Sequence, residues 1–275
     1  MELQLASRKI STDMDAFVMG IVNCTPDSFY EKSRGGLELA LKLIEDGADI
    51  LDIGGESTRP GSLYVDESEE INRVVPVIRE IRKHSDIPIS VDTRKYAVMK
   101  ACLDAGADIL NDVSALEDDE RLVSLAAQTS IPVILMHKRG IPSEMQKSTD
   151  YDDIFREVDS YLSSRADYAA RNGISESKII VDPGIGFGKS LEGNALLIKK
   201  CGQLCGGKFP VLMALSRKTC IGQMTGRDVT GRDASDRLFG TVAANLISVQ
   251  NGASLVRVHD VASCRDSLAV LKSLR

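Results

Sequence analysis

The sequence contains no tryptophan, no excess of positive charge, and no apolar run of the roughly 18 residues that a transmembrane helix needs. Its first segment, MELQLASRKISTDMD, is too polar to be a signal peptide. The formal net charge of -6 is opposite in sign to the basic surface that nucleic-acid-binding proteins present. These absences predict a cytoplasmic protein that binds neither a membrane nor a nucleic acid.

The cysteines form no CxxC pair and have no histidine at a metal-site spacing. Six are scattered along the chain, at Cys24, Cys102, Cys201, Cys205, Cys220 and Cys264. In a chain without a secretion signal, such scattered cysteines are typical of free thiols. We therefore predict neither a disulfide framework nor a zinc site.

Motifs of three other enzyme classes are absent or incomplete. No GxGxxG follows the first predicted strand, which argues against a dinucleotide-binding fold. Residues 183–190 (PGIGFGKS) nearly match the phosphate loop of nucleotide-binding proteins, but they begin with proline instead of glycine. The first strand also lacks a His-x-His, which disfavours a metallohydrolase with His137 and His259 as ligands.

Eight short runs rich in valine, isoleucine and leucine each end in a polar residue. Such continuous apolar runs are typical of parallel strands that are buried on both faces. They cover residues 17–23, 48–55, 87–92, 107–112, 131–137, 178–182, 210–216 and 254–260. Eight strand–helix units in a chain of this length predict an α/β fold, a single (β/α)8 TIM barrel that spans residues 1–275. An open doubly wound sheet is the alternative architecture.

Helical periodicity, with apolar residues three and four apart, fills the segments between the runs. It is clearest over residues 37–45, 67–82, 95–105, 120–128, 154–171 and 235–250. Three helix-to-strand junctions repeat one pattern, which begins at Gly47, Gly106 and Gly252. A glycine there would cap the preceding helix, so the repeat indicates equivalent structural units.

Because ligands bind at the carboxyl ends of barrel strands, the polar residues that end the runs should meet at one opening. They are Asn23, Glu56, Asp92, Asn111, Asp112, His137, Asp182, Ser216, Arg217, Lys218, Arg257 and His259. Individual strand-end aspartates often only cap the following turn, so we expect some members of this set to be structural.

The chemistry of these residues has two halves. Carboxylate and amide oxygens suit a flat heterocycle with adjacent N–H donors, and they come from Asp92, Asn111, Asp112 and Asp182. Cationic side chains suit a phosphate ester, and they come from Arg59, Arg217, Lys218, Arg257 and His259. A substrate with a donor-rich ring at one end and phosphate at the other would satisfy both halves.

Seven strand-end motifs resemble, in order, those of the dihydropteroate synthases of folate biosynthesis. They are NCTPDSF from Asn23, GGESTRPG from Gly54, SVDT from Ser90, NDV from Asn111, DPGIGFGK from Asp182, SRK from Ser216 and RVHD from Arg257. The resemblance extends from about Met19 to Val261 and implies a pterin-binding TIM barrel. It also implies a transferase that joins 6-hydroxymethyl-7,8-dihydropterin pyrophosphate to p-aminobenzoate.

The resemblance assigns a role to each position. The pterin ring would contact Asp92, Asn111, Asp182, Lys218 and Arg257. The pyrophosphate would contact Asn23, Thr58, Arg257 and His259, with Mg²⁺ bound by Asn23. The p-aminobenzoate would contact Phe29, Arg59, Pro60, Phe187 and Thr219. The residues closest to the chemistry would be Asp92, Lys218, Phe29 and Arg59, and pyrophosphate would leave before the amine attacks.

The first loop departs from the family pattern, because residues 30–34 read YEKSR where family members commonly have Ser-Asp-Gly-Gly. This departure leaves open a non-catalytic pterin-binding paralogue. A folate:corrinoid methyltransferase is a third interpretation, although Phe29 and Lys218 belong to the synthase pattern. The family is commonly dimeric and is the target of sulfonamides, so we also expect a homodimer. Sulfonamide susceptibility depends on loop geometry that the sequence does not give.

Overall fold

The computed structural model describes residues 1–24, 34–57, 62, 64–140, 149–226 and 234–275. Eight parallel strands are hydrogen-bonded in the order β8-β7-β6-β5-β4-β3-β10-β9. Val211, just before β9, forms a bridge to Val181 of β8 and brings the two ends of the sheet together. The strands are β3 (Phe17–Asn23), β4 (Ile50–Gly54), β5 (Ile89–Asp92), β6 (Ile109–Asp112), β7 (Val133–Met136), β8 (Ile179–Asp182), β9 (Leu212–Met213) and β10 (Leu255–Val258). The predicted TIM barrel is therefore confirmed, and the open doubly wound sheet is excluded.

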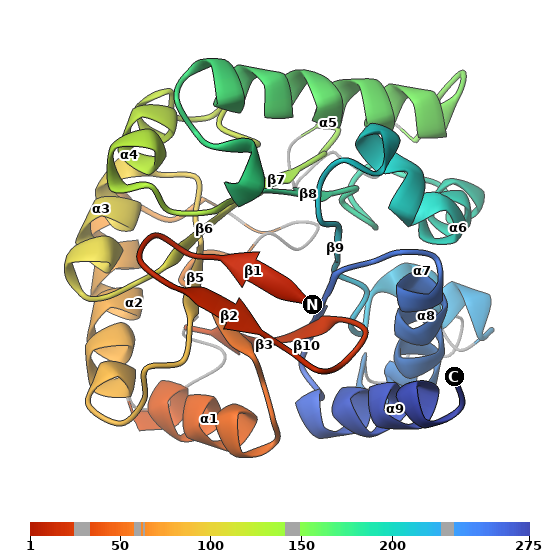
Figure 1. Ribbon diagram of the computed structural model, residues 1–275, viewed down its shortest axis with the longest axis horizontal. Helices are drawn as coiled ribbons and strands as arrows, with labels where there is room; N and C mark the ends of the chain where they lie inside the picture. Colours follow the sequence, from red (N-terminus) through yellow and green to blue (C-terminus); the bar gives the residue numbers. More distant parts are fainter. Residues whose placement is uncertain (25–33, 58–61, 63, 141–148, 227–233) are drawn as a thin grey trace.

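Helices surround the barrel (Figure 1). They are α1 (Arg34–Glu45), α2 (Glu67–Arg82), α3 (Tyr96–Asp104), α4 (Arg121–Thr129), α5 (Ile154–Arg171), α6 (Leu191–Lys200), α7 (Thr219–Met224), α8 (Leu238–Gln250) and α9 (Val261–Ser273). Short 3-10 turns cover Glu176–Lys178, Cys201–Gly207 and Ala234–Arg237. All six segments with clear helical periodicity contain a helix, although 235–250 begins as a 3-10 turn. Within the described ranges, no helix is long and apolar enough to cross a membrane.

The repeated junctions are equivalent units, as predicted. Their first glycines have positive φ angles of 94°, 107° and 102°, which favour glycine after a helix. In the first unit, Asp49 accepts a hydrogen bond from the Val18 backbone (2.8 Å) and forms an ion pair with Arg265 (3.1 Å). Asp108 repeats this arrangement with the preceding strand and with Arg82 (2.6 Å). In these two units the aspartate thus fixes its strand to the neighbouring strand at the amino end of the barrel, whereas the third unit has Ser254 at this position.

A hairpin at the amino end of the barrel was not predicted from the sequence. Its strands, β1 (Glu2–Gln4) and β2 (Lys9–Ser11), are antiparallel and lie across the barrel (Figure 1). Leu3 and Leu5 are buried, and they complete an apolar layer formed by inward-facing side chains of the barrel: Phe17, Met19, Ile50, Ile109, Ile134, Ile180, Leu212 and Leu255. The hairpin thus closes one end of the barrel and leaves the carboxyl end for polar side chains.

Shortening Leu5 should destabilise the fold without altering the opposite end of the barrel. Leu5 is only 1% exposed, so Leu5→Ala leaves a cavity and should lower the free energy of unfolding by about 2–5 kcal/mol. Urea denaturation followed by circular dichroism measures this change. The matched variant Lys9→Ala removes an exposed side chain and should stay within about 0.5 kcal/mol of wild type. A loss below about 1 kcal/mol for Leu5→Ala would contradict the closing role of the hairpin.

Candidate active site

A buried arginine lies between two carboxylates at the carboxyl end of the barrel. Arg257 of β10 places its Nε atom 2.5 Å from Asp52 of β4. Its second terminal nitrogen lies 3.0 Å from Asp92, the last residue of β5. The side chains of the three residues are 17%, 0% and 11% exposed, so little water screens the charges. One cation is therefore shared by two carboxylates within the barrel.

Strand register explains why these side chains meet. Side chains alternate along a strand, so Asp52 follows the inward-facing Ile50 and points into the barrel. Asp92, the last residue of β5, is paired in register with Asn111, the next-to-last residue of β6, so the two lie at the same level. The Asn111 amide nitrogen lies 3.2 and 3.3 Å from the two Asp52 oxygens. Three adjacent strands thus deliver one polar cluster.

Burial raises the pKa of two carboxyl groups at the opening, Asp92 of β5 and Asp182 at the end of β8. It raises the pKa of Asp92 to about 7, against the opposing effect of Arg257, and the Asp52 charge adds to the rise. Burial likewise raises the pKa of Asp182, while Lys218 opposes that shift. Asp182 also accepts a hydrogen bond from the Gly184 backbone (2.7 Å). Hydrogen-bond donors from a ligand would stabilise the charged form of both groups.

Lys218 and the loop after β8 form the other side of the opening. The Lys218 Nζ atom donates to the carbonyl of Ile185 and lies 4.7 Å from the centre of the Phe187 ring. Burial lowers the pKa of Lys218 to about 8, although the nearby Asp182 charge opposes the shift. The structure therefore brings together two residues predicted for different substrates, since Lys218 belongs to the pterin set and Phe187 to the p-aminobenzoate set.

His137 and Lys189 form buried contacts that stabilise the loop after β8. Lys189 Nζ contacts His137 Nδ1 at 2.9 Å and the carbonyls of Gly184 and Phe187 at 2.9 and 3.0 Å. Burial lowers the pKa of His137 to about 3 and that of Lys189 to about 7. A neutral, buried His137 is neither a phosphate-binding cation nor part of any candidate metal cluster among the described residues. The loop that resembles a phosphate loop thus directs its lysine into the protein.

The described residues that were predicted to contact the pyrophosphate lie at the ends of β3 and β10. His259 follows β10, and its Nδ1 atom lies 2.9 Å from the hydroxyl of Ser216. Asn23 ends β3 and is partly exposed. No described residue forms a hydrogen bond with its side-chain amide group. Thr219 is exposed at the first position of α7. Arg217 differs from the expectation of a free cation, because both its Nε and a terminal nitrogen bind Asp260 at 3.0 and 2.6 Å.

Asp112 is not a ring-binding acceptor, and this prediction was wrong. Because Asn111 faces the barrel interior, the next side chain points the other way. Asp112 accepts hydrogen bonds from the Ser114 backbone and hydroxyl, both at 2.7 Å, and from the Leu116 backbone at 2.8 Å. These contacts cap the turn after β6, which is the structural role that strand-end aspartates often have.

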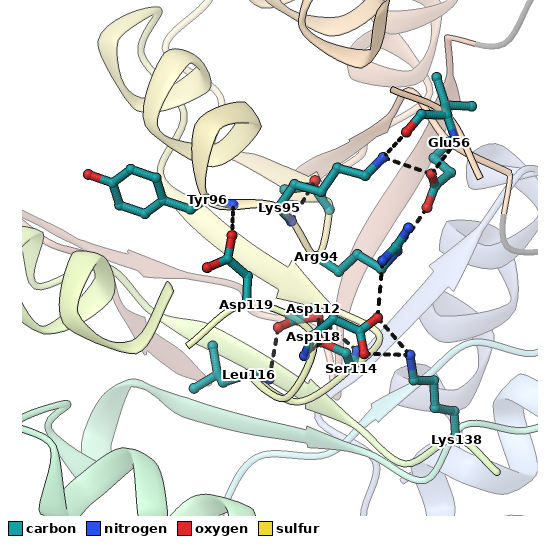
Figure 2. A network of polar contacts seen from close by, with 12 residues as sticks. Glu56, Arg94, Lys95, Tyr96, Asp112, Ser114, Leu116, Asp118, Asp119 and Lys138 are labelled. Atoms are coloured by element: carbon teal, nitrogen blue, oxygen red, sulfur yellow. Dashed lines mark hydrogen bonds and ion pairs between the residues drawn. The ribbon is translucent and has the colours of Figure 1, made fainter. Parts of the chain in front are cut away.

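Glu56 lies on the rim and belongs to a chain of ion pairs that joins four successive loops (Figure 2). Glu56 binds Arg94 at 3.1 Å, Arg94 binds Asp118 at 3.3 Å, and Asp118 binds Lys138 at 3.0 Å. Lys95 also binds Glu56 at 2.7 Å. These contacts tie together the segments that follow β4, β5, β6 and β7.

Four of the predicted substrate contacts lie outside the described residues. They are Phe29, Thr58, Arg59 and Pro60, and the atypical segment 30–33 is outside as well. Their predicted roles stay predictions. The described part of the site contains every predicted pterin contact, and it brings all of them to one end of the barrel.

Comparison with known proteins agrees with this geometry. Residues 19–259 match the family described as "Pterin binding enzyme". The chain belongs to the pterin-binding enzyme family. A dihydropteroate synthase of Neisseria meningitidis serogroup B is 44% identical over 267 residues, which are 94% of this chain and 92% of that protein.

Two solved structures of dihydropteroate synthases have the same fold as this pterin-binding enzyme. The Xanthomonas albilineans protein with 4-aminobenzoic acid has a TM-score of 0.91 and 42% identity, over 99% of this chain and 97% of that one. The Thermus thermophilus protein in complex with 6HMPPP has a TM-score of 0.86 and 36% identity, over the full length of both chains. The resemblance that the seven motifs indicated is therefore confirmed.

Asp52 and Lys189 are the site residues of this family member that sequence analysis missed. Asp52 lies inside a strand instead of at its end, so a search for polar residues at strand ends passes over it. The signal was a charged residue two positions after Ile50 on the inward-facing side of a buried strand. Lys189 ends the family motif DPGIGFGK, but sequence analysis gave it no role of its own.

Pterin binding should weaken as the pH falls through about 7. An ionised carboxylate can accept two parallel N–H bonds, whereas the protonated group loses its charge and turns one oxygen into a donor, and Asp92 becomes protonated below about pH 7. Its charged surroundings are Arg257, Asp52, Glu70 and Asp112. Fluorescence titration with 6-hydroxymethylpterin should show an affinity at least about tenfold lower at pH 5.5 than at pH 7.5.

The matched control is Asp92→Asn, whose side chain does not titrate in this range. Its affinity should be low and nearly independent of pH between these two values. The same pH dependence in wild type and Asp92→Asn would show that another group controls pterin binding.

Proposed function

We propose that this protein is a dihydropteroate synthase. It would condense 6-hydroxymethyl-7,8-dihydropterin pyrophosphate with p-aminobenzoate and release pyrophosphate. One observation carries the proposal, namely that the largely buried acceptor Asp92 and the buried acceptors Asn111 and Asp182 lie beside Lys218 and Arg257 in the barrel opening. The bound molecules of the two synthase structures, 4-aminobenzoic acid and 6HMPPP, support the same pair of substrates.

The pterin ring would contact the buried acceptors through its N–H and amino groups. Asp92, Asn111 and Asp182 offer oxygens from three strands, which suits a flat ring with several donors. Lys218 would donate to a ring or carbonyl acceptor. The planar guanidinium of Arg257 would lie against the ring face, because both carboxylates already occupy one edge of it.

The pyrophosphate would lie near Asn23, Thr58, Arg257 and His259. Mg²⁺ binds oxygen ligands and usually combines one or two protein oxygens with substrate phosphates. The Asn23 amide oxygen, which has no hydrogen-bond partner among the described residues, fits such a site. When bound, Mg²⁺ would neutralise charge on the departing pyrophosphate. His259 keeps one ring nitrogen on Ser216, which orients the other side of its ring.

The p-aminobenzoate would lie beside Phe187, whose ring is partly exposed next to Lys218. Its carboxylate would be close to Thr219 at the start of α7, where backbone N–H groups favour an anion. The remaining contacts, Phe29, Arg59 and Pro60, come from the family resemblance.

The chain supports a dissociative reaction in which pyrophosphate leaves first. Departure creates positive charge that is delocalised into the pterin, and the Asp92 carboxylate would stabilise that charge. The arylamine then attacks a cation, so it needs no strong base. No cysteine is suited to act as a nucleophile, since burial raises the pKa of all six thiols.

Incubation of the purified protein with Mg²⁺, the pterin pyrophosphate and p-aminobenzoate tests this proposal. Mass spectrometry should detect dihydropteroate and pyrophosphate in equal amounts, and Asp92→Asn should slow turnover by at least about a hundredfold. Pyrophosphate release without dihydropteroate would indicate hydrolysis and a defect in p-aminobenzoate binding. If pterin binds but neither product forms, the non-catalytic paralogue is the correct interpretation.

We further propose a homodimer that is formed through α8 and the neighbouring helix α7. Phe239 and Ile247 of α8 are 80% and 48% exposed, and they lie eight residues apart on one face of the helix. Met224 at the end of α7 is 42% exposed. Large apolar side chains gathered on two adjacent helices are typical of a protein–protein interface.

Charge on this face should prevent dimer formation. The double variant Phe239→Glu/Ile247→Glu places like charges at a symmetric interface and should run as a monomer of about 29.8 kDa in size-exclusion chromatography with light scattering. Wild type and the control Val270→Glu, which changes an exposed residue of α9, should run at twice that mass. A monomeric wild type, or a dimeric double variant, would refute this interface.

A further inference from the structure

We propose that Asp52 is a positioning residue that holds Arg257 and Asn111 in the orientations that pterin recognition requires. This inference rests on the proposed function, since Arg257 and Asn111 are both assigned to the pterin ring. No sequence motif identifies Asp52, and its role follows from its contacts in the barrel.

Asp52 does not reach the opening itself. Its side chain is fully buried, and its register partners are Ile21 of β3 and Ser90 of β5, one level below the strand ends. The Asp52 oxygens contact Arg257 Nε at 2.5 Å and Asn111 Nδ2 at 3.2 and 3.3 Å. Asp52 can therefore act on a ligand only indirectly, through its contacts with these two side chains and through its charge, which adds to the rise that burial causes in the pKa of Asp92.

Arg257 depends on Asp52 for the plane of its guanidinium. The Nε atom binds Asp52, and a terminal nitrogen binds Asp92. These two contacts define one edge of the planar group and thereby its orientation. With Asp52 neutral, the Nε contact would lose its charge, and Asp92 would be the one ionised partner among the described residues left to orient Arg257. That carboxylate is also needed by the ligand, so Asp52 leaves Asp92 available for the pterin.

Asn111 depends on Asp52 for the direction of its amide. An ionised carboxylate only accepts hydrogen bonds, so the Asn111 amide must turn Nδ2 toward Asp52. The Oδ1 atom occupies the other corner of the planar amide and is turned away from Asp52. Asp52 thus selects which polar atom of Asn111 is presented as an acceptor for ring N–H groups.

The variant Asp52→Asn tests this role because it removes the charge and keeps the size. We expect the KM for the pterin pyrophosphate to rise about tenfold, while the KM for p-aminobenzoate stays within about twofold of wild type. The melting temperature should fall, because a fully buried partner of Arg257 loses its charge, so the selective rise of one KM and not the stability is the readout of positioning. The matched control is Asp49→Asn, which removes the Asp–Arg ion pair at the opposite end of the barrel and should leave both KM values unchanged.

A double-mutant cycle separates positioning from a general effect on the fold. If Asp52 acts partly through Asn111, the Asp52→Asn change should raise the pterin KM less in an Asn111→Ala background than in wild type. Equal effects in the two backgrounds would remove Asn111 from the proposal. A wild-type pterin KM in Asp52→Asn, or a parallel rise in both KM values, would overturn it.

Asp52→Ser answers the same question if Asp52→Asn does not fold. Serine is smaller and neutral, and it should give the same selective loss of pterin affinity. Failure of both variants to fold would assign Asp52 to stability and overturn the positioning role. Equilibrium titration with 6-hydroxymethylpterin is measured beside turnover. A wild-type protein that binds pterin without forming dihydropteroate would therefore refute the proposed function and still test Asp52.

Discussion

The structure depends on one buried cation that is shared by two carboxylates. Arg257 binds Asp52 and Asp92 inside the barrel, where separating any charge from its partner costs several kcal/mol. Burial raises the pKa of Asp92 to about 7 even though Arg257 opposes the shift, and the Asp52 charge adds to the rise. The barrel therefore holds a polar cluster that a donor-rich ligand would satisfy better than the empty protein does.

The rest of the fold holds this cluster of buried charges in place. The apolar layer below the cluster, closed by the β1–β2 hairpin, supplies the hydrophobic stabilisation that the polar opening lacks. Lys189 fixes the loop that carries Phe187, and the rim ion pairs join the loops that follow four successive strands (Figure 2). The amino end of the barrel interior is thus apolar and the carboxyl end carries the ligand chemistry, which is the division of roles usual in TIM barrels.

Sequence patterns predicted the barrel because buried parallel strands leave continuous apolar runs, and they predicted most of the site because these strands end together. The same reasoning failed where the alternation of side chains along a strand decides which residues face the barrel interior. Asp112 follows an inward-facing asparagine and therefore caps a turn, whereas Asp52 lies one level deeper and escapes a search for strand ends. The hairpin was missed because three-residue strands such as Lys9–Ser11 have no detectable periodicity.

The stability of Asp92→Asn relative to wild type, measured by urea denaturation across pH, tests the central claim most directly. The pKa of Asp92 rises from 3.8 to about 7 on folding, so wild type should lose stability as the pH rises between those values. Asparagine removes this loss, so the variant should gain on wild type by at most about 1.4 kcal/mol per pH unit in that window. A difference that is constant, or that favours wild type increasingly as the pH rises, would contradict a strained charge cluster at the site.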